Sequence, residues 1–150
     1  MSLGLPNIRY LGADLNSDCI KIACNNYSDK VNLDFLVSDG VSFVNSNLKP
    51  SSLYLYLATL ECFAYDELCI VFEMISKLPT SFICLSEPVN IDLERQISSV
   101  PRGRCLYSHN YLHLARYFDF EVIHFEAIPL NSSDKFYQTI NLIIKSTVSA

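Results

Sequence analysis

Apolar runs of strand length alternate along the chain with segments in which apolar residues recur at helical spacing. The runs cover residues 8–15, 31–40, 51–63 and 81–88. The segment 64–79 repeats apolar residues at the spacing of a helix buried along one face, and Pro79 ends it. The residues on that face are Leu68, Val71, Phe72 and Ile75. This alternation predicts an α/β fold, with a Rossmann-like, mainly parallel sheet and helices on both of its faces.

The run 51–63 differs from the others because it carries no charge before Glu61. A strand that is apolar on both faces is typical of the centre of a parallel sheet, which helices cover from both sides. We therefore expect this strand to be buried on both faces, with Tyr54 and Tyr56 as core residues.

Local signals mark the starts of two helices. Asn16 or Ser17 can cap a helix after the first strand, and Asp18 would lie in its first turn. Ser108 can cap a later helix that ends near Phe118.

The C-terminal part differs in kind, because two long strand-like runs follow each other without an intervening helix. They cover residues 120–130 and 135–147 and are joined by the turn-rich 131–134, which predicts an antiparallel hairpin. Earlier in the chain, 41–50 has room for a turn or a short helix, and 89–105 has no regular pattern. The predicted order is therefore β-α-β-β-α-β-α-β-β.

Length and charge restrict the class of protein. The 150 residues fit a single domain, 1–150. The 11 Lys and Arg are scattered and the net charge is −5, which argues against a nucleic-acid partner because phosphate binding needs clustered positive charge. No apolar run approaches the ~18 residues of a membrane span, and the N-terminus lacks a signal-peptide pattern. We expect a cytoplasmic protein that does not bind a membrane.

Cysteine and histidine spacing predicts neither a disulfide nor a metal site. No two of the six cysteines have C-x-x-C spacing, so we expect free, buried thiols. His109 and His113 have H-x3-H spacing, but no acidic or Cys ligand flanks them.

Polar residues follow three consecutive strands at the point where each strand ends. They are Asp14, Asp39, Gly40, Thr59 and Glu61. Ligands of parallel α/β sheets bind at the carboxyl ends of the strands. There Asp14 could accept hydrogen bonds from a ribose diol, and Asp39 from an exocyclic amine. The alternative is that these acids only cap helices or turns, but three such strand ends in succession favour a ligand cleft.

Five segments resemble the class I S-adenosylmethionine-dependent methyltransferases. They are YLGADLNSDCIKIACNNY (10–27), NLDFLVSDGVSF (32–43), YLATLECF (56–63), FICLSEP (82–88) and YSHNYLHLARYFDFEVIHFEAIPL (107–130). These segments look like the family's second to sixth strands, and the last run looks like its antiparallel seventh strand. The resemblance covers roughly 8–147 of this chain.

The resemblance implies a site for S-adenosylmethionine, with S-adenosylhomocysteine as the product. In this family an acid at the position of Asp14 binds the ribose, and Leu15 would pack on the adenine. The residues implied for the cofactor are Asp14, Leu15, Asp39, Gly40, Val41 and Thr59.

The sequence departs from this family at its start. The family has a glycine-rich loop after its first strand, and this chain's four glycines form no such loop: Gly4, Gly12, Gly40 and Gly103. By resemblance, the absent strand would pair with both 8–15 and 51–60, which would otherwise lose hydrogen-bond partners. We therefore expect edge pairing or strand rearrangement at both places. Three explanations are open. The chain is a fragment of a longer methyltransferase, or a second chain completes it, as in a homodimer through strand edges, or it is a degenerate relative of the family.

The leading hypothesis is methyl transfer from S-adenosylmethionine to a small-molecule acceptor. Such transfer needs positioning, and it needs a base only for a protonated nucleophile. Glu61 and Tyr65 are the candidate catalytic residues. The candidate substrate contacts are Glu87, Tyr107, His109 and Tyr111. For His109 we favour a solvated residue at a helix start, and Glu87 could equally shape a turn. The rival hypotheses are a non-catalytic interaction or scaffold domain and a nicotinamide-nucleotide enzyme.

Overall fold

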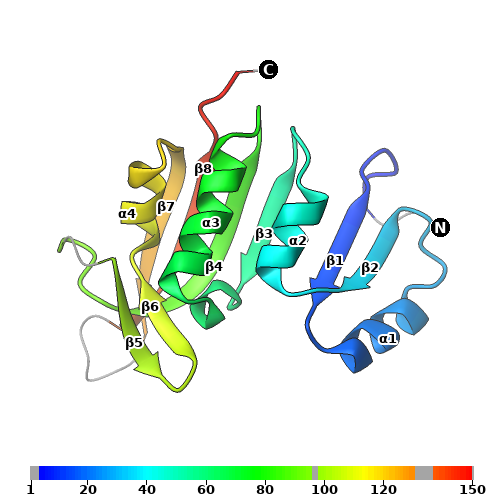
Figure 1. The fold of residues 1–150 in the computed structure, drawn as a ribbon, viewed down its shortest axis with the longest axis horizontal. Coiled ribbons are helices and arrows are strands. Elements are labelled where there is room, and N and C mark those ends of the chain that lie inside the picture. The colour runs from blue at the N-terminus through cyan, green and yellow to red at the C-terminus, as the bar shows by residue number, and fades with distance from the viewer. Residues whose placement is uncertain (1–3, 96–97, 131–136, 150) are drawn as a thin grey trace. The chain divides into compact units, whose positions relative to one another are not determined.

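The chain divides into two compact units in its computed structural model (Figure 1). Residues 4–95, 98–130 and 137–149 are described. Unit 1 is Met1–Leu48 and unit 2 is Lys49–Ala150. The turn predicted at 131–134 lies outside the described residues.

Unit 1 is a β-α-β-α segment. β1 (Tyr10–Asp14) and β2 (Leu33–Val37) pair in parallel, with Asp14 opposite Val37. The helices are α1 (Ser17–Asn26) and α2 (Gly40–Asn47). The predicted strand–helix–strand order is confirmed here, and the stretch 41–50 holds most of a helix rather than a turn.

Both helices of unit 1 begin at a side-chain cap. Asn16 Oδ1 accepts hydrogen bonds from the backbone N–H groups of Asp18 (2.9 Å) and Cys19 (3.3 Å). Asp39 Oδ1 accepts a hydrogen bond from the N–H group of Ser42 (2.8 Å). Such caps satisfy backbone donors that have no partner inside the helix. The polar residues that follow each strand therefore also start the next helix.

Gly12 lies in the middle of β1 for a steric reason. It is opposite Phe35 of β2, and a Cβ atom at position 12 would lie 2.8 Å from a carbon of the Phe35 ring. The Phe35 ring also packs near Tyr27, with 6.0 Å between the ring centroids. The glycine leaves room for this aromatic ring against the strand.

Unit 2 contains a four-stranded sheet and a separate hairpin. The sheet strands are β3 (Leu53–Leu57), β4 (Phe82–Asn90), β7 (Glu121–Pro129) and β8 (Tyr137–Lys145), and their spatial order is β3-β4-β8-β7. β3 and β4 are parallel, whereas β8 is antiparallel to both of its neighbours. The predicted antiparallel pair at the C-terminus is confirmed, and the fold is mixed α/β with a parallel part.

Two helices of unit 2, α3 (Tyr65–Ser76) and α4 (Tyr111–Tyr117), lie on the same face of this sheet (Figure 1). The four residues predicted for the buried face of the segment 64–79 are each 0% exposed. Alternate residues of β4 and β8 are buried as well, and the apolar ones are Ile83, Leu85, Val89, Ile140, Leu142 and Ile144. This alternation gives both strands one covered face.

The leucine side of β3 is exposed. Leu53, Leu55 and Leu57 have exposed fractions of 64%, 59% and 61%, whereas Tyr54 on the opposite side is 8% exposed. The expectation that this strand is buried on both faces is therefore wrong, because the described residues leave the leucine side uncovered. Tyr54 is a core residue as predicted, and Tyr56 is half-buried.

β1 and β3 each have a strand on one side only within the described residues. β1 pairs with β2, and β3 pairs with β4. These residues therefore do not form one complete parallel sheet, and the pairing of either edge with another chain stays a prediction.

The stretch 89–105, expected to be irregular, is largely ordered. It contains the end of β4 and then β5 (Ser99–Gly103), which pairs antiparallel with β6 (Leu106–His109). Sequence periodicity misses this hairpin because its strands are only five and four residues long and Pro101 and Gly103 disfavour strand structure.

Ser108 does not cap a helix, contrary to expectation. It belongs to β6, and its Oγ accepts a hydrogen bond from the N–H group of Asn90 (2.8 Å). Asn110 caps α4 instead, since its Oδ1 accepts a hydrogen bond from the N–H group of His113 (3.0 Å). The hairpin extends through His109 and moves the helix start towards the C-terminus.

The six cysteines are free, as predicted, but none is fully buried. Cys19, Cys24, Cys62 and Cys105 are exposed, and Cys69 and Cys84 are half-buried. The expected burial is wrong for the first two because α1, which carries them, has no buried residue.

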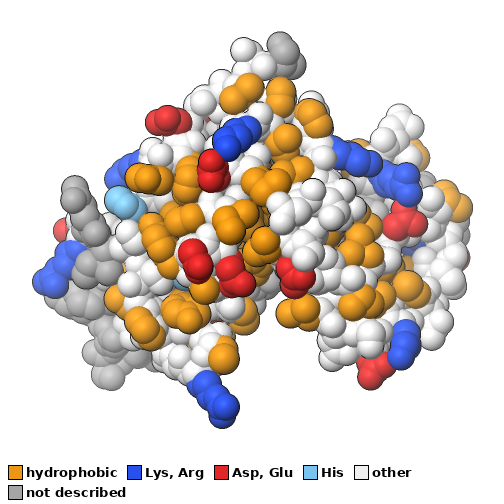
Figure 2. Space-filling model, in the orientation of Figure 1, with side chains coloured by type: hydrophobic (Ala, Val, Ile, Leu, Met, Phe, Trp, Pro, Cys, Tyr) orange, Lys and Arg blue, Asp and Glu red, His pale blue; other side chains and the backbone are white. Residues whose placement is uncertain are grey.

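On the face of unit 2 drawn in Figure 2, acidic and hydrophobic side chains lie between separate Lys and Arg side chains. None of the helices in the described ranges is long and apolar enough to cross a membrane.

Candidate functional site

The acidic residues predicted after the first two strands lie at the same end of the β1–β2 pair. The N–H group of Ser38, next to Asp39, donates to the backbone oxygen of Asp14 (3.0 Å). Asp14 Oδ1 accepts a hydrogen bond from the N–H group of Asn16 (2.7 Å). Asp39 caps α2 through its own Oδ1. Both acids therefore take the capping role that the sequence left open, while both side chains stay exposed.

The residues next to these acids differ in their exposure to solvent. Leu15 is 73% exposed, and Gly40 and Val41 are half-buried in the first turn of α2. Hydrogen bonds from Ser42 lower the pKa of the Asp39 carboxyl because they favour its charged form. Unit 1 thus presents two carboxylates and an apolar side chain beside the strand ends.

In unit 2, a buried carboxylate holds the turn that follows β3. This turn contains a short 3-10 helix, η1 (Leu60–Cys62). Glu87 of β4 is 0% exposed and accepts hydrogen bonds from the N–H groups of Thr59 (2.9 Å), Leu60 (3.0 Å) and Glu61 (3.3 Å). Burial raises the pKa of the Glu87 carboxyl, and the three backbone donors oppose that rise. Glu87 therefore shapes the turn, and its carboxylate faces the backbone rather than solvent.

Glu61 has a partner that the sequence did not reveal. Arg102 of β5 forms an ion pair with the Glu61 carboxylate, and the two side chains are 16% and 13% exposed, respectively. Arg102 also donates to the backbone oxygen of Pro88 (3.2 Å) and lies 6.0 Å from the centroid of the Tyr137 ring. An isolated arginine in a stretch without periodicity gives no sequence signal for this role. The contact ties the β5–β6 hairpin to the turn after β3.

His109 is buried, contrary to the expected solvated position at a helix start. It is 0% exposed and lies in β6. Its Nε2 lies 3.1 Å from the backbone oxygen of Phe63, so Nε2 carries the proton and donates. Burial lowers the pKa of His109 to about 4, and the ring is therefore neutral at pH 7. His109 thus gives the segment after β3 a further hydrogen bond.

Three tyrosines surround the His109 ring. Tyr65 and Tyr107 stack near it, with centroids 6.5 Å and 5.6 Å away, and Tyr111 meets it edge-on at 5.7 Å. Burial raises the pKa of Tyr65 and of Tyr111. The Tyr111 hydroxyl and His109 Nδ1 are buried, and within the described part of the chain neither has a hydrogen-bond partner. The structure therefore brings four of the predicted residues together as a neutral aromatic cluster.

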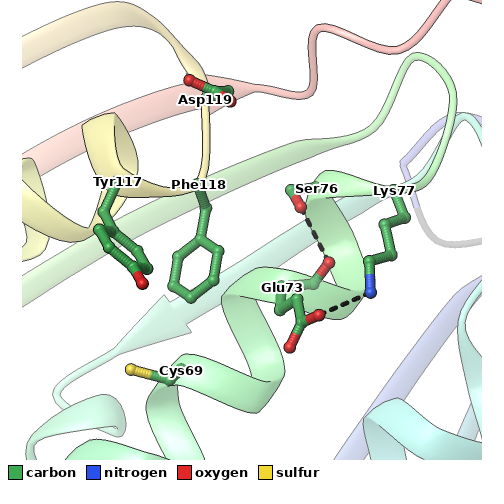
Figure 3. Close-up of a pocket in the computed structure, with 7 residues that line it drawn as sticks. All are labelled: Cys69, Glu73, Ser76, Lys77, Tyr117, Phe118 and Asp119. Atoms are coloured by element: carbon green, nitrogen blue, oxygen red, sulfur yellow. Dashed lines mark hydrogen bonds and ion pairs between the residues drawn. The ribbon is translucent and has the colours of Figure 1, made fainter.

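A surface groove lies elsewhere, between α3 and the end of α4 (Figure 3). Its lining residues are Cys69, Glu73, Ser76, Lys77, Tyr117, Phe118 and Asp119. Lys77 forms an ion pair with Glu73 (2.7 Å), and the Ser76 hydroxyl donates to the backbone oxygen of Glu73 (2.8 Å). None of the residues predicted for a site lines this groove, and two of its charged residues, Lys77 and Glu73, are paired with each other.

Sequence comparison provides no relative, whereas structure comparison does. No protein-family model and no curated protein matches the chain. A crystal structure of a SAM-dependent methyltransferase from Methanosarcina mazei is similar at 15% identity, with a TM-score of 0.65 over 93% of this chain and 82% of the other. The [4+2]-cyclase SpnF is similar at 13% identity, with a TM-score of 0.71 over 95% and 68%.

A further neighbour is the N-methyltransferase NodS from Bradyrhizobium japonicum, solved in complex with S-adenosyl-L-homocysteine. It is 11% identical, with a TM-score of 0.65 over 93% of this chain and 67% of the other. Likeness at such identities establishes the fold and not the activity. The similarity to each of these three structures covers more than nine-tenths of this chain. This chain has the Rossmann-like fold of the class I S-adenosylmethionine-dependent methyltransferases.

Proposed function

We propose that the protein binds S-adenosylmethionine and transfers its methyl group to a small-molecule acceptor. The observation that carries this proposal is the position of Asp14 and Asp39, which follow adjacent parallel strands at the same end of the β1–β2 pair. Carboxylates at such strand ends are the groups that bind the ribose of nucleotide cofactors in Rossmann-like folds. Neighbours solved with S-adenosyl-L-homocysteine or SAM support the choice of cofactor.

The proposed roles in unit 1 follow from the capping bonds described above. The capping bonds of both acids use Oδ1, so Oδ2 of Asp14 would accept from the ribose diol. The exposed Leu15 side chain would pack on the adenine, whose exocyclic amine would donate to Asp39. Gly40 and Val41 would lie along the base. In unit 2, Thr59 is exposed in the turn after β3, and its contact with the cofactor stays a prediction.

Neither candidate catalytic residue of unit 2 is placed to act as a free base. The Glu61 carboxylate is bound to Arg102, and burial raises the pKa of Tyr65 so that its phenol stays protonated. We therefore propose that methyl transfer relies on positioning of the acceptor. Glu61, Tyr65 and Tyr107 are the proposed acceptor contacts, because Glu87, His109 and Tyr111 are fully buried.

Calorimetric titration of the chain with S-adenosylmethionine and S-adenosylhomocysteine tests this proposal. Asp14→Asn keeps an oxygen for the capping bond but removes the charge, and we expect binding to weaken about 10- to 100-fold, as for a lost hydrogen bond to a charged group. The control is Asp18→Asn, which removes a negative charge from the same segment and should leave the affinity for both nucleosides at the wild-type value. A folded chain that binds neither nucleoside, or an Asp14→Asn variant with unchanged affinity, would contradict the proposal.

The second candidate function is that of a non-catalytic interaction domain. It is favoured by the edge of β3 that no described strand covers, beside which three leucines are exposed. The fold itself hosts other roles, since one structural neighbour is named a cyclase. Failure of nucleoside binding in a folded protein is the result that would favour this second function.

A further inference from the structure

β3 has an uncharged strand edge that no other strand of the described residues pairs with. Its sequence is Leu-Tyr-Leu-Tyr-Leu, and it is the terminal strand of the four-stranded sheet. The carbonyl oxygen of Ser52 and the N–H group of Ala58 bond to β4. Since the backbone groups of successive residues point to opposite sides of a strand, the even-numbered positions face β4. The N–H and C=O groups of Leu53, Leu55 and Leu57 therefore point to the open edge.

The opposite edge of the same sheet, β7, is protected and provides a contrast. β7 carries Glu121, His124 and Glu126, has a register shift between Val122 and His124, and ends at Pro129. Charges, bulges and proline are the devices that keep exposed edges from pairing with other chains. β3 has none of them, and its side chains add an exposed leucine surface.

We propose that a second copy of this chain pairs with β3 in antiparallel orientation, around a two-fold axis through Leu55. The sequence of β3 reads the same in both directions, so such an axis places Leu53 opposite Leu57 and Tyr54 opposite Tyr56. Each leucine lies in a hydrogen-bonded pair, because its backbone groups face the open edge. The leucines of both copies then meet on one face and the tyrosines on the other.

A second copy fits this edge better than an unrelated strand because the edge is complementary to itself. A two-fold axis places the residue at its centre opposite its own copy, so a charge there would face a like charge, and β3 has no charge. Directly opposed aromatic and aliphatic pairs stabilise antiparallel strands, and two-fold dimers are the commonest assemblies of identical chains. The proposal is independent of the proposed methyl transfer, which concerns other residues.

Sedimentation equilibrium of the full chain over a range of concentrations tests the proposal. We expect a dimer that Leu55→Lys weakens at least tenfold, because two lysines would face each other across the axis. Ile128→Lys, at a residue of β7 that is 43% exposed, serves as the control and should leave the dimer unchanged. Circular dichroism confirms that both variants fold.

Amide hydrogen exchange on the wild type provides a test that needs no variant. Leu53, Leu55 and Leu57 amides should exchange at least tenfold more slowly at concentrations that favour the dimer than under dilute conditions. A chain that stays monomeric, with rapid exchange at these three amides, would overturn the proposal and leave the edge to a strand of another protein. A dimer that Leu55→Lys does not weaken would overturn it as well.

Discussion

The two units bury very different numbers of side chains. In the described part of unit 1, Val44 is the only buried hydrophobic residue, and α1 has none. In unit 2, α3 alone buries Leu68, Val71, Phe72 and Ile75. A two-stranded sheet with so little covered surface is marginally stable by itself, whereas the four-stranded sheet of unit 2 has a helix-covered face.

The ion pairs of the two units also differ in how far they are buried. Arg9 and Asp34 of unit 1 form an ion pair whose side chains are 77% and 53% exposed, whereas Arg102 and Glu61 of unit 2 are paired at 16% and 13%. An arginine–carboxylate ion pair is therefore exposed to solvent in unit 1, whereas the corresponding pair in unit 2 is mostly buried. This comparison indicates that unit 2 sets the stability of the chain, while unit 1 holds the exposed acids that we propose for cofactor binding.

The largest expected effect is on the core of unit 2. Phe72→Ala removes a fully buried ring that packs edge-on against Phe120 at 5.9 Å, and we expect a loss of about 3–5 kcal/mol in unfolding free energy. Ile22→Ala in α1, at a residue 59% exposed, should change it by less than about 0.5 kcal/mol. Urea denaturation measures both, and comparable losses would contradict the proposed difference between the units.

Acid should destabilise unit 2 through His109. The unfolded chain binds a proton at His109 below its ordinary pKa of 6.5, whereas the folded chain keeps this ring neutral down to a pKa of about 4. Stability contributed by His109 is therefore present above pH 6.5 and is lost as the pH falls towards 4, by up to about 3 kcal/mol.

Urea denaturation between pH 7 and 4 measures this dependence. His109→Gln keeps a donor for Phe63 but does not titrate, so it should be less sensitive to pH across the same window. Histidine NMR titration gives the pKa directly, and a value near 6.5 for His109 would refute the explanation.

Ion pairs in the two units should respond differently to the same substitution. Arg102→Met leaves the mostly buried Glu61 carboxylate without its partner, and we expect a loss of about 2 kcal/mol, less than for a fully buried pair. Arg9→Met, the matched change in unit 1, should cost less than about 1 kcal/mol because its pair is exposed. Equal losses in urea denaturation would show that burial does not distinguish the two pairs.

The smallest expected effect is local to unit 1. Asp39→Ala removes the cap of α2 and should destabilise that helix by about 1 kcal/mol, whereas Asp39→Asn keeps the Oδ1 acceptor and most of the stability. Amide hydrogen exchange in α2 measures the change residue by residue. Faster exchange in α3 as well would mean that the cap of α2 also affects unit 2.

The elements that the sequence predicted well are those with a strong local pattern. α3 is an example, because Leu68, Val71, Phe72 and Ile75 fall on one helical face and all are buried. The two long strands β7 and β8 are another, since no helix separates them and they form an antiparallel pair. The β5–β6 hairpin was missed because its short strands carry no periodic signal.

The positions of the candidate site residues were less predictable. The sequence placed Asp14 and Asp39 at the ends of strands, and they lie there together. It gave no sign that Arg102 pairs with Glu61 or that His109 is buried, because both contacts join residues more than forty positions apart. Side chains brought together by folding leave no local pattern to recognise.

The sequence by itself determined the alternation of strands and helices, the polar strand ends and the resemblance to a methyltransferase fold. Only the tertiary structure decided which faces of these elements are covered. β3 shows the difference: its uncharged sequence indicated burial on both sides, yet Leu53, Leu55 and Leu57 stay exposed. The physical reason is that the hydrophobic effect favours burial of apolar side chains, but they are buried only where another element packs against them.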